Sequence, residues 1–251
     1  MKKWLDGLYG KSELYFALLW IGVYCVGGSL ANPLSQMTGV DSSVHMVFHV
    51  VLTGLLFGWI KKNRLLTYYG LGKPAVTAAR FLWYIPLVVF VSHNLWLGVG
   101  INLPLLDTVC YLVSMFCVGF LEEVIFRGFL FRAIARENRT TAIIVSSVTF
   151  GVGHIINLFN GSGMELVANA CQVVGAVACG FLLVVLFARG GSLIPCILAH
   201  SANNMVSVFA NETGVTVSQK LVLSGINLVI VVVYTLVLTK RLPKGALYEK
   251  V

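Results

Sequence analysis

The chain has 251 residues, of which 58% are hydrophobic and only 11% are charged. A water-soluble domain carries roughly 25% charged residues, so this composition excludes an ordinary soluble domain and favours a helical membrane protein. The formal net charge of +8 does not indicate nucleic-acid binding, because the bases lie in short connections between apolar segments.

Eight apolar segments follow one another along the chain, each near the length of about 20 residues that crosses a bilayer as a helix. We predict spans over residues 14–30, 44–60, 81–101, 105–123, 141–159, 166–187, 193–209 and 221–239. The fourth carries two acids and is expected to continue as a basic amphipathic helix towards Arg136. The sequence therefore predicts an all-α, polytopic membrane protein of about eight transmembrane helices, with residues 1–251 forming a single integral membrane domain.

Charged residues alternate between the connections of the predicted spans. The connections after the second, fourth and sixth spans, and the segment after the eighth, carry the bases Lys61, Lys62, Arg64, Lys73, Arg80, Arg132, Arg136, Arg139, Arg189, Lys240, Arg241, Lys244 and Lys250. The other connections carry Asp41, Asp107, Glu165, Glu212 and, as their only base, Lys220. Because bases are retained on the cytoplasmic side, this alternation predicts that both termini are cytoplasmic.

Three polar clusters interrupt the apolar segments. They are Glu122, Glu123 and Arg127 in the fourth segment, Phe150 to His154 in the fifth, and His200 to Asn204 in the seventh. Ionisable groups are costly in hydrocarbon, so they are kept there when they are paired or hydrated. The clusters are therefore candidate functional residues.

Helical spacing predicts how the first cluster is used. Glu123 and Arg127 are four residues apart, so they share one face of a helix and are expected to pair. Glu122 lies about 100° further round the helix and is left free to face elsewhere. His200 and Asn204 are also four residues apart and project from one face.

The three clusters are expected to meet at one depth, around a polar intramembrane cavity. Glu122 and His154 each lie about sixteen residues from a turn near Asn138, which places them at one level of a helical hairpin that rises ~1.5 Å per residue. His200 lies about eight residues, or ~12 Å, into the seventh segment from the same side. This convergence assumes unbroken helices.

A carboxylate and two imidazoles in one cavity suit the hydrolysis of an amide. That reaction needs a base that takes a proton from water and donors that stabilise the oxyanion. Glu122 is the candidate base, and His154 could orient or share the water. His200 and Asn204 could donate to the oxyanion.

Other interpretations of the same residues stay open. Polar pairs can join helices without any chemistry. Glu122, His154 and His200 are a familiar zinc set, although asparagine is a poor zinc ligand and no His-Glu-x-x-His helix is present. A transporter could use them as a proton relay, but no inverted repeat is visible. His45 and His49 are interpreted as a pair that lines a water pocket.

Taken in order, Glu122-Glu123-x-x-x-Arg127, Phe150-x-x-x-His154 and His200-x-x-x-Asn204 resemble the motifs of the CPBP family of intramembrane proteases. That family joins the CAAX prenyl endopeptidases to bacteriocin-processing and bacteriocin-immunity (Abi) proteins. The resemblance covers residues 105–209. It implies that Glu122 activates water with His154 as its partner, that His200 and Asn204 form the oxyanion site, and that Glu123 and Arg127 brace the cavity.

The resemblance also implies a class of substrate. We expect an endopeptidase that acts on a lipidated or strongly hydrophobic peptide, with membrane lipids around it, in a bacterial plasma membrane. No cofactor is expected, and zinc at Glu122, His154 and His200 is the alternative. The rival function is a non-catalytic membrane scaffold or bacteriocin self-immunity protein that acts by binding.

Overall fold

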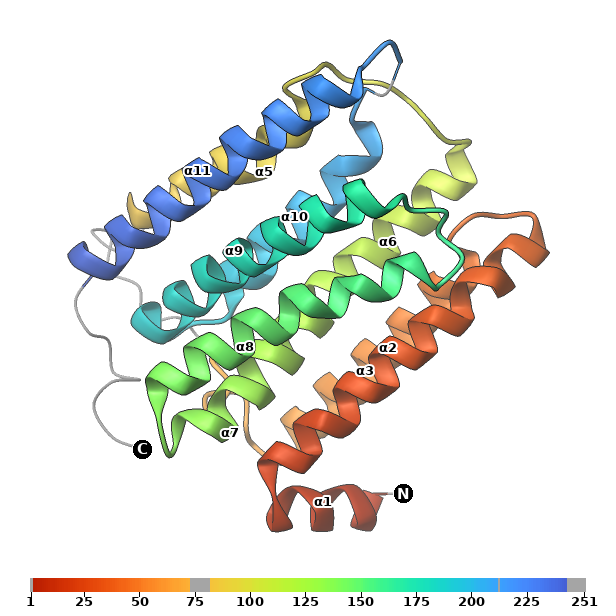
Figure 1. The fold of residues 1–251 in the computed structure, drawn as a ribbon. Helices are drawn as coiled ribbons and strands as arrows, with labels where there is room; N and C mark the ends of the chain where they lie inside the picture. Colours follow the sequence, from red (N-terminus) through yellow and green to blue (C-terminus); the bar gives the residue numbers. More distant parts are fainter. Residues whose placement is uncertain (1, 73–81, 212, 243–251) are drawn as a thin grey trace.

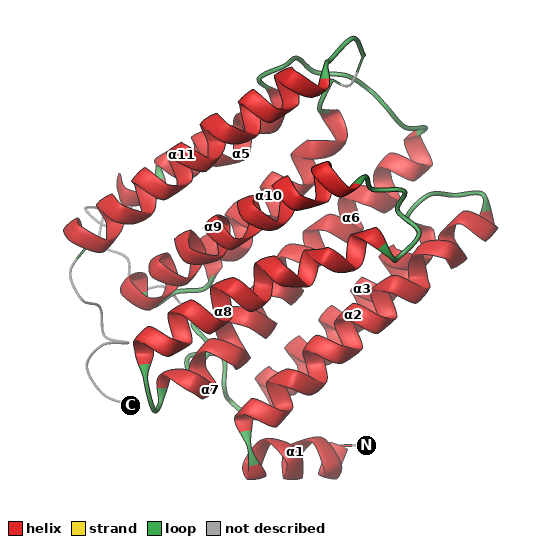
Figure 2. Cartoon of the chain, in the orientation of Figure 1, coloured by secondary structure: helices red, strands yellow, loops and turns green. Residues whose placement is uncertain are grey.

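The computed structural model describes residues 2–72, 82–211 and 213–242. Over these ranges the protein is all-α, and its only β-type pairing is one isolated bridge between Val99 and Ala210 (Figure 2). Several residues of the sequence predictions lie outside the described ranges: Lys73, Arg80, Glu212, Lys244, Lys250 and the first residue of the predicted third span, Phe81.

Six helical segments of the described chain are long and apolar enough to cross a membrane. They are α2 (Glu13–Thr38), α3 (Ser43–Lys62), the continuous segment Leu105–Ala135 that contains α6 (Leu105–Glu122) and α7 (Phe131–Ala135), Arg139–Leu158 with α8 (Arg139–Gly153), α9 (Leu166–Gly190) and α11 (Val217–Arg241). The chain is therefore an integral membrane protein, and six of the eight predicted spans are confirmed as long apolar helices.

The third and seventh predicted spans form shorter helices than expected. These are α5 (Pro86–Ser92), which a 3-10 turn extends to Leu95, and α10 (Ile194–Val206). A helix of 13 residues is only about 20 Å long, less than the ~30 Å of the hydrocarbon core. Each helix has a proline in its first turn, where the missing N–H costs nothing. After α5 the chain turns at Gly98, whose φ of 108° ends regular helix.

The helices form a bundle in which the Leu105–Ala135 segment is the most buried span (Figure 1). The α2–α3 hairpin lies on one side of the bundle, and α11 with α5 lies on the opposite side (Figure 1). Between them, α6 packs against α3 and α10, while α9 packs against α8 and α11. Contact between α6 and α10 is close, because a Cβ added to Gly119 would lie 2.6 Å from the backbone nitrogen of Ser201. Glycine at position 119 therefore lets α10 approach the acidic segment.

A short helix, α1 (Lys2–Lys11), lies across one end of the bundle (Figure 1). Asp6 fixes it there, because its carboxylate accepts a hydrogen bond of 2.8 Å from Trp59 Nε1 and pairs with Lys62 at 3.5 Å. The hydrogen bond from Trp59 is the main reason why the pKa of Asp6 lies below its usual value. The same end holds the basic ends of α3, α9 and α11, so the bases gather on one side of the bundle.

Candidate active site

The two adjacent acids lie where the helix of the fourth span changes type. Glu122 is the last residue of α6, and Glu123 begins a π-helical segment that runs to Leu130. Every residue of this segment is buried. The expectation of an unbroken α-helix is therefore wrong over residues 123–130, because the backbone here takes the wider i→i+5 pattern. π-Helical insertions are rare and are frequent at functional sites.

His200 joins the two acids. Its Nδ1 lies 2.8 Å from Glu123 Oε1, and its Nε2 lies 3.3 Å from Glu122 Oε2. The imidazole is buried, with 4% of the residue exposed. The sequence analysis placed these residues in one cavity but did not predict that one ring would contact both carboxylates.

Glu123 and Arg127 form the predicted pair. Arg127 Nη1 lies 3.0 Å from Glu123 Oε1, and both side chains are fully buried. The guanidinium also lies over the ring of Phe150, with Cζ 4.1 Å from the ring centroid. The same phenyl ring meets His200 edge-on at 5.7 Å, so Phe150 contacts both the guanidinium and the imidazole.

Glu122 has a partner that the sequence analysis missed. Tyr24, on α2, donates a hydrogen bond from its hydroxyl to Glu122 Oε1 at 2.7 Å. With His200 on the other oxygen, Glu122 is not the free acid that helical spacing predicted. The only signal in the sequence is a tyrosine within an apolar span, whose hydroxyl must find a partner when it is buried.

His154 and Asn204 are close to the site in the fold but do not contact Glu122 among the described residues. His154 Nδ1 lies 3.0 Å from the Phe150 carbonyl oxygen, which only accepts, so Nδ1 carries a proton and donates it to this oxygen. The His154 ring lies edge-on to Phe150, 5.2 Å away. In the described ranges the Asn204 side chain has one hydrogen bond, which its Oδ1 accepts from Asn203 Nδ2 at 3.5 Å. Both residues are half-buried.

The zinc alternative does not fit this arrangement. Within the part of the chain that the structure describes, no three His, Cys, Asp or Glu side chains are grouped closely enough to hold a metal ion. Both nitrogens of His200 face carboxylates, and Nδ1 of His154 is bonded to a backbone oxygen. A zinc ion needs three or four ligands at about 2 Å from a common point, and these side chains do not offer one.

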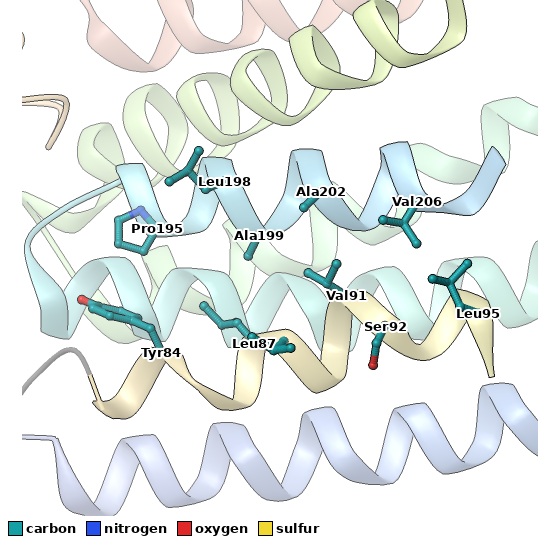
Figure 3. A pocket seen from close by; sticks show the side chains of 11 residues that line it. Tyr84, Leu87, Val91, Ser92, Leu95, Pro195, Leu198, Ala199, Ala202 and Val206 are labelled. Atoms are coloured by element: carbon teal, nitrogen blue, oxygen red, sulfur yellow. The ribbon is translucent and has the colours of Figure 1, made fainter. Parts of the chain in front are cut away.

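An apolar groove runs along the other side of α10, between that helix and α5 (Figure 3). Its volume is about 620 Å³. It is lined by Tyr84, Leu87, Val88, Val91, Ser92, Leu95, Pro195, Leu198, Ala199, Ala202 and Val206. The groove and the acidic site therefore share α10, and Ala199 on the groove wall directly precedes His200.

The fold and the site define a polytopic helical membrane protein with two acids, a histidine and an arginine buried together in its core. Residues 104–206 match the model of the family described as type II CAAX prenyl endopeptidase Rce1-like, so this part of the chain is a domain of that peptidase family. The match confirms the resemblance found in the motifs, all of which lie within it. Neither a curated protein nor a solved structure matches the chain.

Proposed function

We propose that the protein is an intramembrane endopeptidase in which Glu122 activates the attacking water. One observation carries the proposal: within a domain of a peptidase family, a buried carboxylate lies 3.3 Å from a histidine in the core of a membrane protein. Burying an acid in a membrane protein costs free energy, so an acid that is retained there is a candidate functional residue. The structure also supplies what a base needs, which is a fixed position and a low-dielectric setting.

Each candidate residue has a role in the proposed reaction. Glu122 takes a proton from water as the oxygen attacks the peptide carbonyl carbon, and it then delivers this proton to the leaving amine. With His154 neutral, its Nε2 accepts a hydrogen bond from the same water and orients it. His200 Nε2 and the Asn204 amide donate to the oxyanion of the tetrahedral intermediate.

Glu123 and Arg127 act as support in this scheme. The short bond from His200 Nδ1 to Glu123 fixes the ring so that Nε2 faces the reacting groups. Arg127 balances the charge of Glu123 in a place that water does not reach. The 3.3 Å contact of His200 Nε2 with Glu122 is long and therefore weak, so the N–H can donate to an oxyanion beside it while the ring stays in place.

The substrate proposed is a lipidated or strongly hydrophobic peptide that enters from the bilayer. The apolar groove between α5 and α10 supports this, since it offers apolar walls beside the helix that carries His200 and Asn204. The gathering of bases at the α1 end supports a cytoplasmic location of both termini. A bacteriocin, pheromone or signal-peptide-like chain in a bacterial plasma membrane fits these features.

Replacing Ala202 with phenylalanine is expected to weaken substrate binding. Ala202 lines the groove (Figure 3), and a phenyl ring there takes volume that the apolar part of the substrate would occupy. We expect KM for a farnesylated peptide to rise about tenfold, with kcat changed less than about twofold. The groove binds the apolar part of the substrate equally in the ground state and in the transition state, so its loss affects KM and not kcat. Ala170→Phe on the exposed surface of α9 is the matched control and leaves KM unchanged. An unchanged KM in Ala202→Phe would exclude the groove as the substrate site.

The proposed function is tested with purified protein in detergent micelles and an internally quenched peptide that carries a farnesylated cysteine near its carboxyl end. Release of a short carboxyl-terminal peptide, identified by mass spectrometry, is the expected result. The His200→Ala protein, purified in the same way, controls for contaminating peptidases. If correctly inserted wild-type protein cleaves neither this probe nor hydrophobic peptides recovered from its own membranes, the non-catalytic scaffold is favoured instead.

A further inference from the structure

Tyr24 belongs to a helix outside the matched peptidase domain, yet it contacts the proposed catalytic base. It lies on α2, whereas the family match begins at residue 104. Its hydroxyl donates to Glu122 Oε1 at 2.7 Å, a short distance typical of a bond from a hydroxyl to a carboxylate. No other hydroxyl of the described residues contacts Glu122.

The ring of Tyr24 packs against His49 of α3, which is itself fixed by a contact with α6. It stacks against His49 on α3, with 5.8 Å between the ring centroids and an angle of 30° between the planes. His49 is buried, with 4% exposed, and its Nδ1 lies 2.9 Å from Ser114 Oγ on α6. His45 in turn stacks on His49, with 5.5 Å between the ring centroids. These contacts fix the tyrosine ring and leave its hydroxyl aimed at Glu122.

Two helices thus hold the two oxygens of one carboxylate. Tyr24 on α2 contacts Oε1, and His200 on α10 contacts Oε2. The terminal torsion of a glutamate is broad and would otherwise let the carboxylate rotate. A carboxylate offers about four lone-pair directions, so two contacts leave others free for a water.

We infer that Tyr24 is a positioning residue that fixes the orientation of the Glu122 carboxylate for catalysis, and hence that the α2–α3 hairpin is part of the catalytic machinery. The inference rests on the proposed role of Glu122 as the base. The other reading of the contact is that the hydrogen bond only joins α2 to α6. Such a bond would affect stability and leave the kinetics of the folded enzyme as they are.

Several titratable groups surround Glu122 and enter the interpretation of any pH profile. They are Tyr24 and Cys25 on α2, Glu123 and Arg127 in its own span, Cys179 on α9 and His200 on α10. Tyr24→Phe changes one of them and leaves the other five in place. A shift in the profile of this variant therefore reports on the bond to Glu122.

The test compares Tyr24→Phe with wild type in cleavage of the farnesylated quenched peptide. We expect kcat to fall about 10- to 100-fold with KM changed less than about twofold, because a hydrogen bond to the reacting carboxylate is lost while the groove is intact. The acidic limb of kcat/KM should also move, because the hydrogen bond from the hydroxyl to the reacting carboxylate is lost. Tyr15→Phe, which removes an exposed hydroxyl from the same helix, is the matched control and leaves both properties unchanged.

A second variant keeps the test decisive if Tyr24→Phe does not fold. Incorporation of 3-fluorotyrosine at position 24 keeps the ring and the hydroxyl but makes the phenol a stronger donor. The acidic limb should then move in the direction opposite to that of the phenylalanine variant, because the bond is strengthened instead of lost. If folded Tyr24→Phe, or the fluorotyrosine protein in its place, has the kcat and pH profile of wild type, the inference is overturned.

Glu122→Gln, assayed in parallel, separates this inference from the proposed function. If Glu122→Gln is inactive and Tyr24 variants behave as wild type, only the positioning role is wrong. If Glu122→Gln cleaves at the wild-type rate, the role of Glu122 as the base is wrong, and the inference about Tyr24 is overturned with it.

Discussion

Glu122→Gln protein is expected to insert and fold like wild type and to cleave the quenched peptide about 10³-fold more slowly. Glutamine has the shape of glutamate and can still accept a hydrogen bond from Tyr24, so the fold is preserved. It cannot take a proton from water, and a positioned general base contributes about 10²- to 10⁴-fold to a rate. Initial rates of fluorescence release at saturating peptide measure this loss directly.

Glu137→Gln is the matched control for that experiment. Glu137 is exposed in the turn that follows α7, so the change removes the same charge without touching the buried site. Its rate should equal that of wild type. A Glu122→Gln protein that is correctly inserted and cleaves as fast as Glu137→Gln would remove glutamate-activated water from the mechanism.

Arg127→Ala is expected to destabilise the protein by about 3–5 kcal/mol, which is the cost of leaving a buried charge without its partner. Arg127 and Glu123 are both fully buried, so no water can replace the guanidinium at the Glu123 carboxylate. The change also empties the space over Phe150 that Arg127 now fills. Unfolding in mixed micelles, with increasing fractions of a denaturing detergent, measures the free energy of unfolding.

Arg136→Ala provides the comparison for a pair at the surface. Arg136 contacts Glu13 at 2.6 Å, closer than the buried pair, but 48% of its side chain is exposed. Only 10% of the Glu13 side chain is exposed, but Tyr68 also donates to its carboxylate and water reaches the guanidinium, so loss of the pair should cost at most about 1 kcal/mol. If Arg127→Ala and Arg136→Ala lower the free energy of unfolding equally, burial does not determine the strength of the Glu123–Arg127 pair.

The sequence predicted the parts of the site that depend on neighbours along one helix. Glu123 and Arg127 are four residues apart, which brings their side chains close enough to pair in an α-helix and also in the π-helical segment observed. The structure confirms this pair. The order and spacing of the three motifs were sufficient to identify the peptidase family. Hydropathy predicted eight spans, and six of them are long apolar helices in the structure. This signal is local, because a helix that crosses a membrane needs a long run of apolar residues.

The sequence did not predict where the backbone departs from the α-helix. The π-helical turn at Glu123 depends on how the fourth span packs against α2, α8 and α9, which no local pattern encodes. The short lengths of α5 and α10 were missed for a related reason. Apolar residues in the flanking turns of these helices resemble a continued span, while their backbone has already changed from the α-helix to 3-10 turns.

The sequence by itself determined that this is a helical membrane protein with acids, histidines and an arginine inside its apolar segments, because composition and spacing along one helix are local properties. Only the tertiary structure decided which side chains meet. It brought His200 against both Glu122 and Glu123, gave His154 and Asn204 hydrogen-bond partners other than the acid, and placed Tyr24 of a distant helix on Glu122. The physical reason is that contacts between helices depend on their rotation and depth in the bundle, which are set by packing at close approaches such as Gly119 to Ser201.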